Sequence, residues 1–277
     1  MKTKTPTMAQ PWINCEGRCL AEFSAGKALV TLTSTLMLLG QQAQGALIFS
    51  DANDGFIEVR DTLPPADPWP QVHPDTFGNF RAAIGEWFGP GLTAAVLPFQ
   101  LPDFGAVANP FVSADLGVML FQTGGATTVT DIDLYAVRTD ASPLIATSDY
   151  YNGSAIDPSA TLIQESFLTP ASPVGFVGAP NNNTDAGGDA ALLSYLNGAY
   201  DGGNGAGQYV FLRLSYAGDA YATAYDGYSI TLREAGQEGE WPVINYTAVP
   251  EPTAAGLCAL GSLMWLGHRS RRKTTGA

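Results

Sequence analysis

Few side chains in the middle of the chain could take part in catalysis. Between Ala46 and Ala248 there is no cysteine, and His73 is the only histidine. A serine hydrolase would need that histidine beside a nucleophile, yet the sequence contains no G-x-S-x-G turn. A catalytic zinc ion would lack nitrogen and sulfur ligands. The residue types therefore predict a protein that is not an enzyme.

Carboxylates are the one remaining route to catalysis. The same segment holds 23 Asp and Glu residues, and a pair of carboxylates is what most glycosidases use. Asp131 and Asp133 lie two positions apart in a predicted strand, so their side chains share one face. A solvated strand edge explains this pair more simply. A secreted glycan hydrolase is therefore the least favoured of three function classes.

Two oxygen-rich loops carry ligands of the kind that Ca²⁺ prefers. In the first loop Asp51, Asn53 and Asp54 precede a glycine, and Glu58 follows it. Residues 181–189 form the second loop, with three Asn and two Asp. Neither loop has the twelve-residue spacing of an EF-hand, and both patterns are equally typical of Asx turns. Calcium is the only cofactor that these residues suggest.

Aromatic rings could bind a sugar, because the CH groups of sugars stack on rings while their hydroxyl groups need directed polar partners. The candidates for glycan contact are Trp69, Tyr221 and Tyr225. The two tyrosines lie within residues 216–228, where four tyrosines are interspersed with Gly, Ala and Asp. Packing of these rings in the core is the alternative. A specific carbohydrate-binding module is accordingly the second function class.

Residues 1–45 follow the order of a secretory signal peptide. A basic region is followed by an apolar run at 28–39 and by Ala43-Gln44-Gly45, a small-x-small sequence suited to signal peptidase. The apolar run is too short for an ordinary membrane-spanning helix. We therefore expect a signal helix that signal peptidase removes, with a buried helix of the mature fold as the alternative.

The last 29 residues combine three features in order. Val249, Pro250, Glu251 and Pro252 form a stiff extended segment. The apolar stretch 253–267 follows, which as a helix would reach roughly 22 Å at about 1.5 Å per residue. These features predict a short transmembrane helix whose positive end stays in the cytoplasm. The basic stop at that end consists of Arg269, Arg271, Arg272 and Lys273.

This arrangement resembles the PEP-CTERM sorting signal of Gram-negative bacteria. The resemblance implies that exosortase, a transpeptidase-like membrane enzyme, recognises Pro250-Glu251-Pro252 and removes the helix and the basic tail. It also implies a route from an inner-membrane intermediate to the cell surface or extracellular matrix, where the protein would associate with exopolysaccharide or biofilm. A non-catalytic surface or matrix protein is therefore the leading function class, and an ordinary tail anchor is the alternative.

Charge is distributed unevenly along the chain. The net charge of the whole chain is −13, but the segment 46–248 sets its 23 acidic residues against five arginines and no lysine. A surface this acidic repels nucleic acid and anionic lipid headgroups. Nucleic acid is therefore not an expected partner, and polysaccharide is the partner that the PEP-CTERM resemblance implies.

Short apolar or alternating segments, separated by Gly, Pro, Asn and Asp, predict an all-β fold, an antiparallel β-sandwich of jelly-roll type. One or two helical turns are expected at 190–197, and the proline-rich run 63–74 is expected to be an extended loop. The expected domains are the signal peptide at 1–45, the β-sandwich at 46–248 and the sorting signal at 249–277. The predicted strands are 47–50, 56–60, 93–99, 112–121, 127–138, 161–167, 208–216, 228–233 and 243–247.

Several of these segments resemble DNRLRE-type domains, which are grouped with carbohydrate-binding modules. The resemblance implies the same β fold and a role in binding sugars, although the motif that names the family is absent from this sequence. It rests on residues 93–102, 112–118, 133–137, 208–214 and 242–246.

Overall fold

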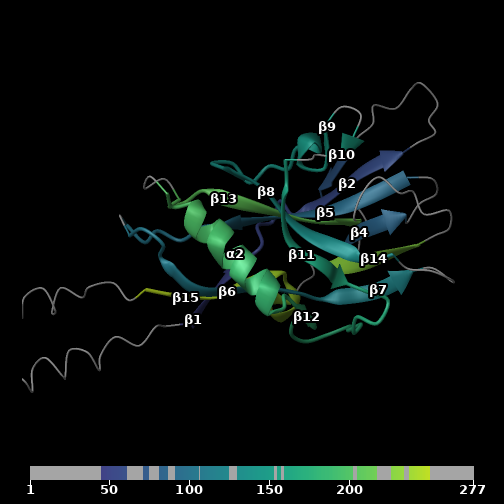
Figure 1. Cartoon of the computed structure of the whole chain (residues 1–277). Helices are drawn as coiled ribbons and strands as arrows, with labels where there is room; N and C mark the ends of the chain where they lie inside the picture. Colours follow the sequence, from purple (N-terminus) through teal and green to yellow (C-terminus); the bar gives the residue numbers. More distant parts are fainter. Residues whose placement is uncertain are drawn as a thin grey trace, which may run out of the picture. The chain divides into compact units, whose positions relative to one another are not determined.

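A computed structural model of the chain describes residues 45–60, 71–74, 81–86, 91–105, 107–124, 130–152, 155–156, 159–201, 205–216, 226–233 and 237–249. These residues form mostly antiparallel β-structure and a single α-helix, α2 (Ala186–Gly198) (Figure 1). This confirms the predicted all-β class. No helix in this part of the chain is long and apolar enough to cross a membrane. The predicted signal helix and the predicted helix at 253–267 lie outside the described residues.

The smaller sheet has four strands, in the order β1 (Gly45–Phe49), β15 (Val243–Ala248), β6 (Phe111–Val118) and β12 (Asn182–Asn183). Its edge strand β1 pairs with β15 in a register that places Gly45 opposite Thr247 and Phe49 opposite Val243. The start of the first strand therefore lies beside the end of the last strand.

The strands of the larger sheet are β2 (Gly55–Arg60), β3 (Gln71–Pro74), β4 (Arg81–Glu86), β5 (Gly91–Gln100), β7 (Leu120–Gly124), β8 (Ile132–Asp140), β11 (Thr161–Leu168), β13 (Tyr209–Tyr216) and β14 (Asp226–Thr231). The sheet is centred on β5, which pairs with β13 over residues 95–100 and with β2 over residues 91–96. β3 extends the sheet from β2, and β4 continues it beyond the end of β13. A separate pair of short strands, β9 (Tyr151–Asn152) and β10 (Ala155–Ile156), lies near the 3-10 helix η1 (Thr147–Asp149).

Both sheets bury apolar side chains in one core. Leu116 and Ile244 come from the smaller sheet, and Val96 and Leu97 come from β5 of the larger sheet. All the residues of β5 from 92 to 99 are buried. Because successive side chains of a strand point to opposite faces of the sheet, both faces are covered along this part of β5. A strand covered in this way is expected to read as a nearly continuous apolar run, as LTAAVLPF does.

The chain passes from one sheet to the other at Met119. β6 ends at Val118 in the smaller sheet, and β7 begins at Leu120 in the larger sheet. The prediction of one strand over 112–121 was therefore wrong, because residues 116–120 are all buried and this stretch gives no sign of where the chain changes sheets. The predicted loop at 63–74 was also wrong in its last four residues, which form β3. Pro74 ends that strand, where a missing N–H group is tolerated.

α2 begins after Asp185, whose carboxylate accepts a hydrogen bond from the backbone N–H of Gly188 at 2.8 Å. Such an N-cap satisfies one of the free donors of the first helical turn. Leu192 and Leu196 share one face of the helix and are fully buried, and they fix α2 against β6 and β11 (Figure 1). The predicted helix at 190–197 is thus confirmed and is longer at its N-terminus.

Arg138, near the end of β8, is held by a buried carboxylate. Its Nε and Nη2 atoms donate to the two oxygens of Asp149, which is 1% exposed, and its Nη1 atom donates to Asp140. The backbone carbonyl of Asp149 also accepts a hydrogen bond from Nη1 of Arg213 in β13, at 3.1 Å. The Arg138 guanidinium lies 3.7 Å from the ring centroid of Phe211. These contacts join the end of β8 to β13 and to the loop that follows β8.

Replacing Asp149 with Asn should lower the free energy of unfolding by about 3 kcal/mol, because Arg138 would lose the buried one of its two counter-charges. Urea denaturation of the two proteins measures the difference. Asp140→Asn is the matched control. The Asp140 side chain is 48% exposed, so its loss should cost less than about 1 kcal/mol. Equal losses in the two variants would contradict a structural role for the buried carboxylate.

Candidate functional site

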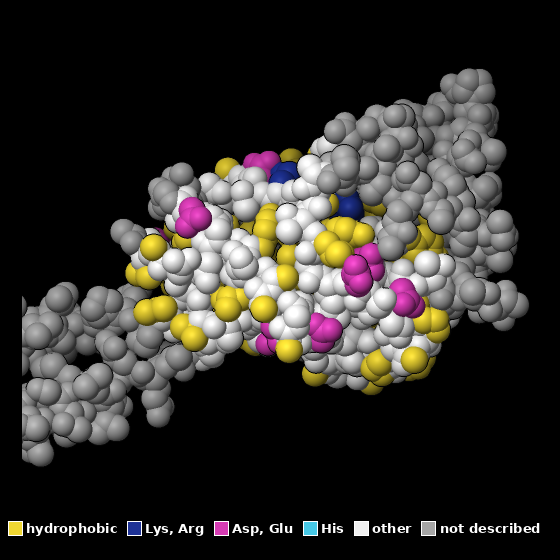
Figure 2. Space-filling view, in the orientation of Figure 1, with side chains coloured by type: hydrophobic (Ala, Val, Ile, Leu, Met, Phe, Trp, Pro, Cys, Tyr) yellow, Lys and Arg dark blue, Asp and Glu magenta, His cyan; other side chains and the backbone are white. Residues whose placement is uncertain are grey.

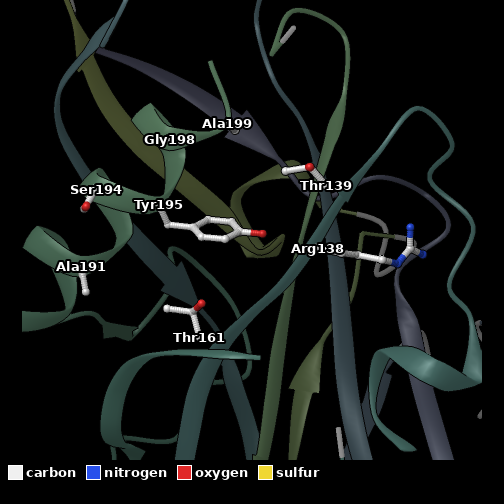
Figure 3. A pocket seen from close by; sticks show the side chains of 8 residues that line it. All are labelled: Arg138, Thr139, Thr161, Ala191, Ser194, Tyr195, Gly198 and Ala199. Atoms are coloured by element: carbon white, nitrogen blue, oxygen red, sulfur yellow. The ribbon is translucent and has the colours of Figure 1, made fainter. Parts of the chain in front are cut away.

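The candidate site is a cavity between α2 and the end of β8, which we call the α2–β8 groove (Figure 3). It is open to solvent and has a volume of about 620 Å³, within the range of about 300–1,000 Å³ that is typical of ligand sites. It is lined by Arg138, Thr139, Thr161, Ala191, Ser194, Tyr195, Gly198 and Ala199.

The groove exists because β11 is shorter than β8. β11 pairs with β8 from Thr161 opposite Ala136 onward, so residues 137–140 of β8 extend beyond this ladder. On the other side, α2 turns a flank of small residues toward the groove: Ala191, Ser194, Gly198 and, just beyond its end, Ala199. The missing strand partner and the small side chains together leave the space open.

Tyr195 is the one large side chain that α2 contributes to the groove. Its ring points from the helix toward β8 (Figure 3). The residue is partly buried, and its hydroxyl makes no hydrogen bond to another described residue. Thr139 and Thr161 lie nearby in the same lining, whereas the Arg138 guanidinium points away from Tyr195 (Figure 3).

The electrostatics of the groove follow from burial. Burial raises the pKa of the Tyr195 hydroxyl to about 12, and the Arg138 charge opposes this only in part. The phenol is therefore neutral at physiological pH and can both donate and accept a hydrogen bond. Burial lowers the pKa of Arg138, but Asp149 and Asp140 more than offset this and raise it. Arg138 is therefore a permanently charged group whose guanidinium is engaged by those carboxylates.

The predicted calcium ligands Asp51 and Asp54 accept hydrogen bonds from groups of the protein itself. Oδ1 of Asp51 accepts hydrogen bonds from the backbone and the side chain of Asn53, which is the Asx turn that was the alternative. Oδ2 of Asp54 accepts hydrogen bonds from the hydroxyl of Ser50 and from the backbone N–H of Arg233, which lies two residues after the end of β14. Within the described residues, no three His, Cys, Asp or Glu side chains lie together as a metal site would require.

The fourth predicted ligand, Glu58, lies on β2 and faces the adjacent strand. Its carboxylate is 3.2 Å from Nε2 of His73 on β3, and Phe56 on the same strand stacks on the His73 ring. Glu58 is 4% exposed. The only histidine of the segment 46–248 thus pairs with a buried carboxylate, and calcium binding by Glu58 stays a prediction.

Asp131 and Asp133, the carboxylate pair suggested for a hydrolase, stabilise a β-bulge in β11. Oδ1 of Asp133 accepts a hydrogen bond from the backbone N–H of Ser166, and Asp131 accepts one from its hydroxyl. Ser166 has φ of 51°, a left-handed conformation that costs free energy in a non-glycine residue. The second oxygen of Asp133 accepts from the Tyr135 hydroxyl. Each carboxylate is thus engaged in local structure.

Several predicted site residues lie outside the described part of the chain. Val249 is described, and it follows directly after β15. The others are the candidate glycan contacts Trp69, Tyr221 and Tyr225, the motif residues Pro250, Glu251 and Pro252, and the basic stop Arg269, Arg271, Arg272 and Lys273.

The sequence did not point to Tyr195 as a site residue. Its position on the helix was predictable, since Leu192 and Leu196 define the buried face and Tyr195 falls on the flank. The groove was not predictable, because it depends on where β11 begins to pair with β8.

A comparison with protein-family models finds no match to this chain, and a search of curated proteins finds no similar sequence.

Tyr195→Phe should reduce the loss of stability at high pH. The folded-state pKa of about 12 lies above the ordinary value of 10.0, so the folded chain holds this proton more tightly than the unfolded chain. The resulting stability is complete below the ordinary pKa and is lost as pH rises through the folded-state pKa. The free energy of unfolding, measured from about pH 9 to about pH 12, should therefore fall less steeply in the variant. Equal slopes would mean that this phenol ionises at its ordinary pKa.

Calcium at millimolar concentration should leave the melting temperature unchanged, because the carboxylates of Asp51 and Asp54 already accept hydrogen bonds from their own loop. Differential scanning calorimetry with calcium and with magnesium measures this. A saturable rise with calcium that Asp51→Asn removes would instead establish the predicted calcium loop.

Proposed function

We propose that the protein is an exported, non-catalytic surface or matrix protein with a β-sandwich of jelly-roll type, sorted by exosortase and associated with exopolysaccharide. The observation that carries this proposal is the order of three features after residue 248: Val249-Pro250-Glu251-Pro252, an apolar stretch and a basic stop. The acidic, cysteine-free segment 46–248 is compatible with a hydrated extracellular matrix.

The positions of the strand ends support this proposal. Ala46, near which the mature chain would begin, lies opposite Tyr246 in the β1–β15 ladder. The two segments predicted to enter the membrane therefore continue from neighbouring points on the smaller sheet. A single membrane could hold both segments while β1 and β15 remain paired, so sorting would require no unfolding of the sheet.

The last described residue supports access to the motif. The backbone N–H of Val249 donates to the carbonyl of Pro110 at 2.8 Å, and Val249 is 43% exposed. β15 has already ended at Ala248. A protease acting at Pro250-Glu251-Pro252 would thus meet its substrate after the last strand and not within it.

A second candidate function is a specific carbohydrate-binding module, and the α2–β8 groove favours it. The groove has the size of a ligand site and offers hydroxyl groups beside an aromatic ring. The two functions are compatible, because a matrix protein can be held by one saturable sugar site.

Glu251→Ala should prevent removal of the C-terminal segment if exosortase reads the Pro-Glu-Pro sequence. The intact mass of the protein from its native host is the measurement, taken with and without exosortase. The wild-type mass should correspond to a chain that starts near Ala46 and ends near Pro250–Pro252. In the variant and in the exosortase mutant, the mass should include the apolar stretch and the basic stop.

Glu238→Ala is the matched control, because Glu238 is an exposed residue of the 3-10 helix η2 (Glu238–Glu240) and precedes the motif. Its processing should be normal. A wild-type mass that still includes Arg271 and Arg272 in both strains would indicate an ordinary tail anchor and remove the main support for the matrix proposal.

A further inference from the structure

We propose that the α2–β8 groove binds a neutral sugar residue of a polysaccharide chain, with Tyr195, Thr139 and Thr161 as its contacts. This proposal rests on the proposed function, because it names the site through which the exported protein would be held in a polysaccharide matrix.

The hydroxyl groups of the groove are available to a ligand. Tyr195, Thr139, Thr161 and Ser194 all line the groove, and none of these side chains makes a hydrogen bond to another described residue. Other hydroxyls of the same region do have protein partners, as Thr184 does with Asp189. Hydroxyl groups that both donate and accept match the hydroxyl groups of a sugar, which do the same.

An aromatic ring completes this chemistry. Tyr195 is only partly buried, and its ring projects from α2 into the groove (Figure 3). The small neighbours Ala191 and Gly198 leave space beside it. Sugar CH groups pack on such a ring, while its hydroxyl stays protonated because burial raises its pKa to about 12. The Tyr195 ring can thus pack on the CH groups of a sugar residue while the Tyr195 hydroxyl forms a hydrogen bond with one of its hydroxyl groups.

The charge around the groove favours a neutral ligand over an anionic one. Among the described residues that line the groove, Arg138 alone is cationic, and its guanidinium donates to Asp149, to Asp140 and to the carbonyl of Leu144. A uronate or phosphate would therefore find no free cation there. On the face that carries α2, charged side chains of the described residues are scattered and do not form a basic patch (Figure 2).

The openness of the groove suits an internal residue of a chain. Thr139, Thr161, Ser194 and Gly198 are all exposed at its rim. A closed pocket would admit a free monosaccharide or a chain end, whereas an open groove allows a polymer to continue on both sides.

The test is calorimetric titration of the full-length chain, held in a detergent without a sugar headgroup. The probes are cellohexaose, laminarihexaose, mannohexaose and xylohexaose, with an oligoguluronate as the anionic reference. The wild type should bind at least one neutral hexasaccharide saturably. Tyr195→Phe should weaken that binding roughly five- to tenfold, because it removes one hydrogen bond and keeps the ring. Tyr195→Ala should abolish measurable binding.

Tyr246→Phe is the matched control. Tyr246 is a partly buried tyrosine of β15 that packs on Phe104 and Phe111, away from the groove lining. Its variant should bind within about twofold of the wild type, since it loses a hydroxyl that the ligand does not contact. Tyr221→Ala with Tyr225→Ala tests the other tyrosines suggested for glycan contact.

Four results would overturn the proposal: no binding to any neutral hexasaccharide, binding to oligoguluronate alone, unchanged binding in both Tyr195 variants, or equal weakening by Tyr246→Phe. Retention of the protein in the matrix fraction of its host is scored separately. If both Tyr195 variants are retained like the wild type and bind sugars normally, the groove proposal fails while the matrix function stands. If the wild type itself is absent from the matrix, the proposed function fails.

Discussion

A carboxylate almost fully removed from water is the constraint around which the candidate site is organised. Burying the Asp149 charge is costly unless it is paired and hydrogen-bonded, and it accepts from Arg138 and from the backbone N–H of Ala146. The backbone carbonyl of Asp149 accepts a hydrogen bond from Arg213, a core residue that is 1% exposed. Asp149, the last residue of η1, thereby connects the neighbouring strands β8 and β13 and the segment that directly follows β8. The last residues of β8 keep their position beside α2 without support from β11, because β13 pairs with residues 138–140 and this network holds Arg138.

Strands could be predicted from the sequence where an alternating or apolar segment is bounded by turn residues on both sides. Segments such as 161–167 and 243–247 alternate or run apolar between turn residues, and they match β11 and β15. β4 was missed because Arg81-Ala-Ala-Ile-Gly-Glu has small residues and charged ends. It is a strand because β14 pairs along it and the Thr93 hydroxyl of β5 donates to the carbonyl of Gly85. The burial of Arg213 was also not predictable from local sequence. The alternating pattern of β13 suggests that its side chain faces solvent, whereas tertiary contacts leave it 1% exposed.

The candidate site depended even less on local sequence. The calcium pattern was read correctly as an oxygen-rich turn, but hydrogen bonds within the turn explain Asp51 and Asn53 without a metal. Asp131 and Asp133 lie close together, as their spacing predicted, yet both are used to hold Ser166. The groove arises from a difference in length between two strands distant in sequence, and no motif records such a difference. Only the flank of α2 on which Tyr195 lies could be derived beforehand.

The pairing of β1 and β15 also has a mechanical meaning. A pull applied at Val249 acts along β15, which has antiparallel partners on both sides, β1 and β6. The hydrogen bonds of such ladders lie perpendicular to the strands, so the load is shared among all of them in shear and they cannot break one at a time. Flow past a cell would exert a force of this kind on any protein held by its C-terminal end. β15 is thus the strand of the smaller sheet best placed to resist a pull applied at Val249.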